Sequence, residues 1–223
     1  AFVTAYGATY NPSKNSLKLP QLIALKASAD ATLADVITKN THYNNKVNER
    51  ITAFSGLKSL STRLVNALQT TDATTETIGN AKTFNRKMQG KKASSSQTPT
   101  DPNTPAPNTI STSQQSYDQL IQHLAGLTSI LEAETSYTPN ETDLQVATLQ
   151  AKIADLSAKN TAVATAYTSI SNSRIARNET LYSSTTGLVE TANEVKKYVK
   201  SVFGTSSPQF AQVKGIEFKK PKI

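Results

Sequence analysis

The feature that most constrains this chain is a stretch from Asn140 to Thr186 that contains neither proline nor glycine. Along it, apolar residues recur mostly three and four positions apart, which places them on one face of an α-helix. The spacing is coiled-coil-like, so the face is a narrow seam suited to packing against another helix. We therefore expect a long helix here, about 65 Å if it is straight, at 1.5 Å per residue.

The same periodicity appears elsewhere in the chain, from Pro20 to Ser55, from Leu57 to a natural stop at Gly90, and from Leu188 to Gly204. Hydrophobic residues make up only 37% of the 223 residues, and Trp and Cys are absent, so a core must consist mainly of Leu, Val, Ile and Ala. These observations predict an all-α fold: an elongated bundle of long antiparallel helical hairpins with short extended N- and C-terminal arms.

Composition divides the chain into five segments. The opening residues are β-branched and aromatic, the middle is rich in Ser, Thr and Pro, and the tail alternates apolar residues with lysines. The predicted segments are an extended N-terminal arm (1–19), a first helical hairpin (20–90), a Pro/Ser/Thr-rich linker (91–112), a second helical segment with the long helix (113–204) and an extended basic C-terminal arm (205–223).

A faint internal repeat links the two halves. Residues 35–41 are similar to residues 155–161, and residues 82–90 are similar to residues 196–204. One interpretation is a duplication in which each half is a long helix folding back on a second. The alternative is chance similarity in a biased composition.

Charge and residue types exclude several classes of function. The net charge of +8 is distributed as +8 over residues 1–92, −6 over 93–195 and +6 over 196–223. Without cysteine there is no disulfide or thiolate metal site, and neither His42 nor His123 has His, Asp or Glu at i+3 or i+4. We expect no enzyme, no cofactor, no metal site, no small-molecule substrate and no membrane span, with His42 at the surface and His123 at the edge of an apolar face.

Two asparagines lie where the helical seams would otherwise be apolar, Asn40 and Asn160. A buried Asn in such a seam commonly fixes the register of neighbouring helices at some cost in stability. We interpret both residues as register determinants, with ligand binding as the alternative.

The leading functional prediction is a non-enzymatic structural protein that self-associates as a homo-oligomer, such as a filament or sheath subunit. Apolar arms at both ends would be hard for one copy to cover, and the basic, acidic, basic order suits contact between copies. Lys200 and the lysines at 219, 220 and 222 would face carboxylates of the acidic middle, namely Asp118, Glu132, Glu134, Glu141 and Asp143. The candidate self-association residues are Phe2, Val3, Tyr6, Phe210, Val213, Ile216, Phe218, Lys219 and Lys220.

The alternative prediction is a basic adaptor that binds nucleic acid or another polyanion. Its candidate patch lies at the end of a predicted helix and comprises Lys82, Arg86, Lys87, Lys91 and Lys92. Cations at that position also complement the negative end of the helix dipole, which is the simpler explanation.

The second half resembles an uncharacterised family of helical proteins from Bacteroidota. The resemblance rests chiefly on the run from Ser171 to Tyr182 (SNSRIARNETLY) and the run from Lys197 to Gln209 (KYVKSVFGTSSPQ). It implies a bacterial origin and a helical fold but no particular activity. Members of that family start without an export signal, which implies the cytoplasm, while the absence of cysteine leaves a cell-surface or extracellular location open.

Overall fold

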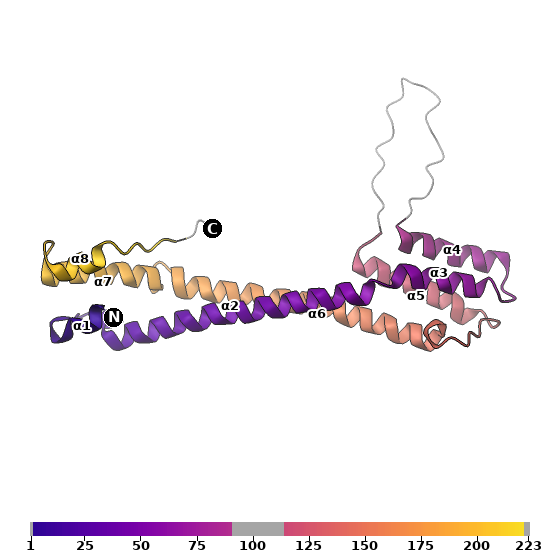
Figure 1. Ribbon diagram of the computed structural model, residues 1–223, viewed down its shortest axis with the longest axis horizontal. Coiled ribbons are helices and arrows are strands. Elements are labelled where there is room, and N and C mark those ends of the chain that lie inside the picture. The colour runs from indigo at the N-terminus through magenta and orange to yellow at the C-terminus, as the bar shows by residue number, and fades with distance from the viewer. Residues whose placement is uncertain (1, 91–113, 221–223) are drawn as a thin grey trace, which may run out of the picture. The chain divides into compact units, whose positions relative to one another are not determined.

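The computed structural model describes residues 2–90 and 114–220 (Figure 1). Within these ranges the chain is all-helical and contains no β-strand, as the periodicity predicts. The predicted linker at 91–112 lies outside the described residues. The helices are α1 (Phe2–Ala5), α2 (Leu19–Phe54), α3 (Leu57–Leu68), α4 (Thr75–Gln89), α5 (Tyr117–Ala133), α6 (Val146–Tyr182), α7 (Leu188–Phe203) and α8 (Pro208–Lys214). Short 3-10 turns are η1 (Gly7–Thr9), η2 (Asn15–Leu17) and η3 (Thr142–Leu144).

The chain divides into two compact units that do not follow the predicted segments. Unit 1 consists of residues 1–44 and 166–223, and unit 2 of residues 45–165. The two long helices, α2 and α6, each contribute residues to both units.

Unit 2 contains α3, α4 and α5, with α4 packed against both of the others (Figure 1). Its core is built from leucines on successive turns, such as Leu64, Leu68, Leu124 and Leu131, which are almost fully buried. Local capping explains the helix ends: the hydroxyl of Thr74 accepts a hydrogen bond from the Thr77 amide, and Gly90 takes the left-handed conformation that ends α4.

A close approach in unit 2 requires glycine at position 126. A Cβ atom at this position would collide with Cε1 of Phe84 on α4. The ring of Phe84 therefore packs directly on the backbone of α5, where any larger residue would displace it.

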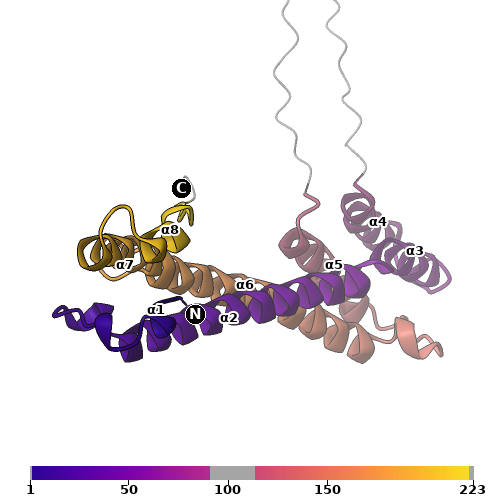
Figure 2. The ribbon, with the colours of Figure 1, turned by 60° about the vertical axis from the view of Figure 1, so that its left-hand side comes forward.

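The extended terminal arms are a wrong prediction. Residues 2–5 form α1 and residues 208–214 form α8, and both segments pack within unit 1 (Figure 2). The second helix has the expected start signals, since Pro208 occupies its first turn and the Ser207 hydroxyl accepts a hydrogen bond from the Phe210 amide. In the described tail, residues 205–207 before α8 and residues 215–220 after it have no regular secondary structure.

The long helices begin with the same local motif. Before α2, the buried Tyr10 hydroxyl donates a hydrogen bond to the Leu17 carbonyl at 2.8 Å; before α6, Tyr137 does the same to Leu144 at 2.9 Å. Each tyrosine is followed by a proline two residues later and by a 3-10 turn that ends at the leucine. We call this arrangement the Tyr–Leu turn.

The Tyr–Leu turns match the helices of the two halves differently from the sequence comparison. Turn η2 contacts α7, the helix that follows α6, and turn η3 contacts α3, the helix that follows α2. The structural counterpart of α7 is therefore α3, whereas the sequence comparison paired residues 196–204 with residues 82–90, which lie on α4. The two tyrosines are 127 positions apart, one heptad more than the spacing between the similar runs at 35–41 and 155–161.

Candidate interaction site

The predicted self-association residues come together in unit 1. Tyr6 donates a hydrogen bond from its hydroxyl to the Gln209 carbonyl at 2.9 Å, and its ring lies 5.2 Å from the ring of Phe203. Val3, Tyr6 and Phe210 pack against a small buried cluster that consists of Tyr10, Leu17, Val195, Val199 and Val213. The N- and C-terminal segments thus cover one another within a single chain.

Some of the predicted self-association residues remain at the surface. The exposed fractions of Phe2, Ile216 and Phe218 are 43%, 39% and 37%. These three side chains line an apolar groove of about 230 Å³ together with side chains of α2 and α7. Lys219 and Lys220 are exposed, and Lys219 forms an ion pair with Glu217 at 2.9 Å.

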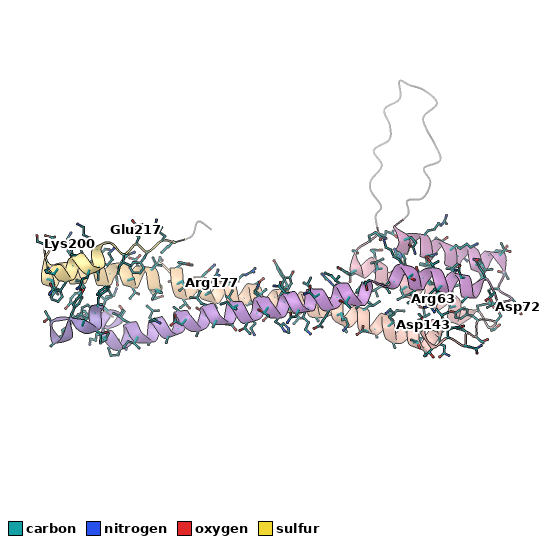
Figure 3. The ribbon with its side chains drawn as sticks, in the orientation of Figure 1. Arg63, Asp72, Asp143, Arg177, Lys200 and Glu217 are labelled. Carbon is teal, nitrogen blue, oxygen red and sulfur yellow. The ribbon has the colours of Figure 1, made fainter. Side chains whose placement is uncertain are left out.

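A basic hollow of about 480 Å³ adjoins this groove. It is lined by Lys196, Lys197, Lys200 and Lys214, with Glu190 as the acidic member. Lys196 lines both the hollow and the groove, and its ammonium group donates a hydrogen bond to the Ile216 carbonyl at 2.8 Å. Figure 3 labels Lys200 on α7 and Glu217 on the following tail.

The carboxylates expected to face these lysines have local partners. Asp143 forms an ion pair with Arg63, which holds the pKa of Asp143 below its ordinary value chiefly through the hydrogen bond between them (Figure 3). Glu134 accepts hydrogen bonds from the amide and hydroxyl of Ser136, and these lower its pKa. Glu132 accepts from Gln150 at 3.1 Å. Three of the carboxylates predicted to contact a second copy therefore already have partners within the chain.

The predicted register residues differ in their surroundings. The Asn160 amide oxygen accepts a hydrogen bond from Arg50 at 2.9 Å, and its nitrogen donates to Asp118 at 2.7 Å. The Arg50 guanidinium also lies 4.0 Å from the centre of the Tyr117 ring. Asn40 is half-buried and has no side-chain hydrogen bond within the described part of the chain.

The described members of the candidate polyanion patch lie on α4. Arg86 and Lys87 occupy its last turn, next to the Gly90 cap, and Lys82 is one turn earlier. Arg86 donates a hydrogen bond to the Thr83 hydroxyl, and the Lys87 ammonium lies 5.6 Å from the centre of the Phe84 ring. Lys91 and Lys92 fall outside the described residues.

Neither histidine has the surroundings of a metal ligand. His42 is exposed on α2. His123 is buried rather than at the edge of its helix face, and burial, together with nearby Lys87, lowers its pKa. Among residues 2–90 and 114–220, no three His, Cys, Asp or Glu side chains are grouped so that they could hold a metal ion.

No helix in the described ranges has both the length and the apolar character needed to cross a bilayer. Comparisons with protein family models, with curated proteins and with solved structures find no match.

Proposed function

We propose that this chain is a non-enzymatic structural protein that self-associates, with its long helices arranged as antiparallel hairpins. The observation that carries the proposal is a set of large apolar side chains that unit 1 leaves in solvent. They are Ile23, Leu33 and Ile37 on α2 and Tyr167 and Ile175 on α6.

The spacing of these residues suits contact with another helix. Ile23 and Ile37 are two heptads apart and Leu33 lies one turn before Ile37, so the three follow one side of α2. Ile37 and Ile175 are 68% and 67% exposed, although isoleucine is among the residue types most often buried. A second copy of the chain presents the same apolar stripe and is the occupant that we propose.

Unit 1 also has a smaller core than unit 2. Among the described residues, unit 2 contributes nine of the largest fully buried apolar side chains, whereas unit 1 contributes Ile170 and Val199. Burial of apolar surface contributes about 25 cal/mol per Å², so covering the exposed stripe would add stability that unit 1 lacks.

Sedimentation velocity at several protein concentrations and low salt tests this proposal. We expect the average mass to rise with concentration, and the double variant I37Q/I175Q to shift the association constant at least about tenfold, because two exposed apolar anchors are lost from each copy. Ala31→Gln, an exposed change on another side of α2, is the control and should associate like the unchanged protein. A strict monomer at high concentration would contradict the proposal, and negative-stain images would tell filaments from closed oligomers.

Binding of nucleic acid or another polyanion is a weaker candidate. The described cations on α4 already complement the negative end of that helix, and the one aromatic side chain among them, Phe84, packs on Gly126. That packing takes the ring away from stacking on a base.

A further inference from the structure

The apolar groove and the basic hollow of unit 1 share Lys196. The groove side offers Leu22 and Leu25 of α2, Leu188 and Val195 of α7, and Phe218 of the tail. The hollow side offers ammonium groups and one carboxylate. The apolar groove therefore lies directly beside a positively charged surface, an arrangement that suits a ligand with one apolar end and one anionic end.

The Lys196 ammonium group has spare donors at this junction. Of its three N–H groups, one is donated to the Ile216 carbonyl, which fixes the side chain across the boundary between groove and hollow. The other N–H groups can bind an anion there, with Lys197 and Lys200 adding positive potential on the hollow side.

We propose that this site binds an anionic single-chain amphiphile, such as a fatty-acid carboxylate. The hydrocarbon chain occupies the groove, where its methylene groups are removed from water, and the head group accepts hydrogen bonds from Lys196. At about 230 Å³ the groove is smaller than the pockets that hold drug-sized ligands, which favours one unbranched chain.

The charge of the head group distinguishes an anionic amphiphile from the other ligands that the groove could hold. A neutral alcohol of the same length fits the groove but gains no charge-assisted hydrogen bond, and a cationic amphiphile places its head group against three or more lysines. A helix from a second copy would bring further polar side chains to the rim and does not need a carboxylate at Lys196.

Isothermal titration of the full chain tests the proposal, with laurate and dodecyltrimethylammonium below their micelle-forming concentrations and dodecanol below its solubility limit. We expect saturable laurate binding with one site per chain, dodecanol about tenfold weaker, and no binding of the cationic probe, since a charge-assisted hydrogen bond is worth roughly tenfold or more in affinity. Absence of saturable laurate binding, or equal binding of laurate and the cationic probe, would overturn it.

Variants locate the site. Ala192→Trp fills the groove from α7 and should abolish binding of both laurate and dodecanol. Leu25→Gln changes a groove residue on α2 and should weaken the binding of both probes. It replaces Ala192→Trp as the test if the tryptophan variant does not fold. Lys196→Gln should weaken laurate about tenfold and leave dodecanol unchanged. Lys26→Gln removes a lysine on α2 that pairs with Asp30 and should change neither.

Sedimentation of the same proteins separates this inference from self-association. Laurate binding that Ala192→Trp abolishes while the average mass stays unchanged supports the amphiphile site. If Ala192→Trp instead removes association and laurate does not bind, the groove is occupied by a second copy and the inference is wrong.

Discussion

At Asn160 one amide group joins three helices of unit 2. It accepts from Arg50 on α2 and donates to Asp118 on α5, while its own backbone belongs to α6. Polar groups that satisfy each other in this way specify which residues face one another, because any shift along the helix breaks both bonds. Asn40, which the periodicity places in a comparable seam, has no such partners among residues 2–90 and 114–220.

Replacing the two asparagines by leucine should therefore give opposite results. Asn160→Leu leaves Arg50 and Asp118 without their shared partner and should lower the free energy of unfolding by about 1 to 2 kcal/mol. Asn40→Leu adds apolar contact in the seam and should be neutral or stabilising. Urea denaturation followed by circular dichroism compares them, and equal destabilisation by both changes would argue against a special role for Asn160.

The two tyrosines of the Tyr–Leu turns predict how stability depends on alkaline pH. Burial raises the pKa of Tyr10 and of Tyr137 to about 12 in the folded protein, against about 10 in the unfolded chain. Above pH 10 the unfolded chain loses these protons more readily, so the stabilisation present below pH 10 is lost as the pH rises to about 12.

The double variant Y10F/Y137F should show a shallower loss of stability between pH 10 and 12 than the unchanged protein. At pH 7 it should be less stable by about 1 kcal/mol per site, because each leucine carbonyl loses its donor. Urea midpoints at pH 7, 10 and 11 measure both effects. Y43F, a change at a half-buried tyrosine whose hydroxyl has no hydrogen bond within the described ranges, is the control.

At the scale of elements, the close contact between α4 and α5 depends on Gly126. Alanine stabilises an exposed helix interior by up to about 1 kcal/mol relative to glycine, but here its Cβ would collide with the Phe84 ring. Gly126→Ala should therefore destabilise the protein.

In a Phe84→Ala background, where the ring is absent, the same Gly126→Ala change should become stabilising. The double-mutant cycle measures the sign reversal directly as a coupling free energy in urea denaturation. If Gly126→Ala has the same sign in both backgrounds, the Phe84 ring is not what requires glycine.

The sequence predicts the long helices because their apolar periodicity and lack of proline act locally. It fails at the ends for an identifiable reason. The β-branched and aromatic character of the opening residues predicts an extended segment, because such residues favour strands, but Val3 and Tyr6 pack on the cluster around Val213 while Phe2 remains exposed. In the tail, the spacing from Phe210 to Val213 fits a helix turn, and the Ser207 and Pro208 signals were already present.

The site was less predictable than the helices. Lys196 and Leu22 are far apart in the sequence, and only tertiary packing of α2 against α7 brings them to one groove. Similarly, nothing local to Asn160 indicates Arg50 or Asp118 as partners, which lie 110 and 42 positions away. The sequence shows that Asn160 is a polar residue at an apolar position, but it does not show which residues contact it.

At the scale of the whole molecule, the two units should differ in stability. Unit 2 has the larger buried cluster, so we expect amides of α3 and α5 to exchange with solvent more slowly than those of α7 and α8. Hydrogen exchange followed by mass spectrometry measures this. Protection in unit 1 should rise with protein concentration if a second copy covers it, and concentration-independent exchange would count against that.

The division into units also has a consequence for synthesis on the ribosome. Unit 2 is one continuous segment and is complete once Thr165 has emerged, whereas unit 1 combines the first 44 residues with residues from 166 onward. Because a chain is made from its N-terminus, the start of α2 emerges well before its partners α7 and α8. During that interval Tyr10, Leu17 and Leu22 lack Val195, Val199 and Val213, the side chains that complete their buried cluster in the folded chain.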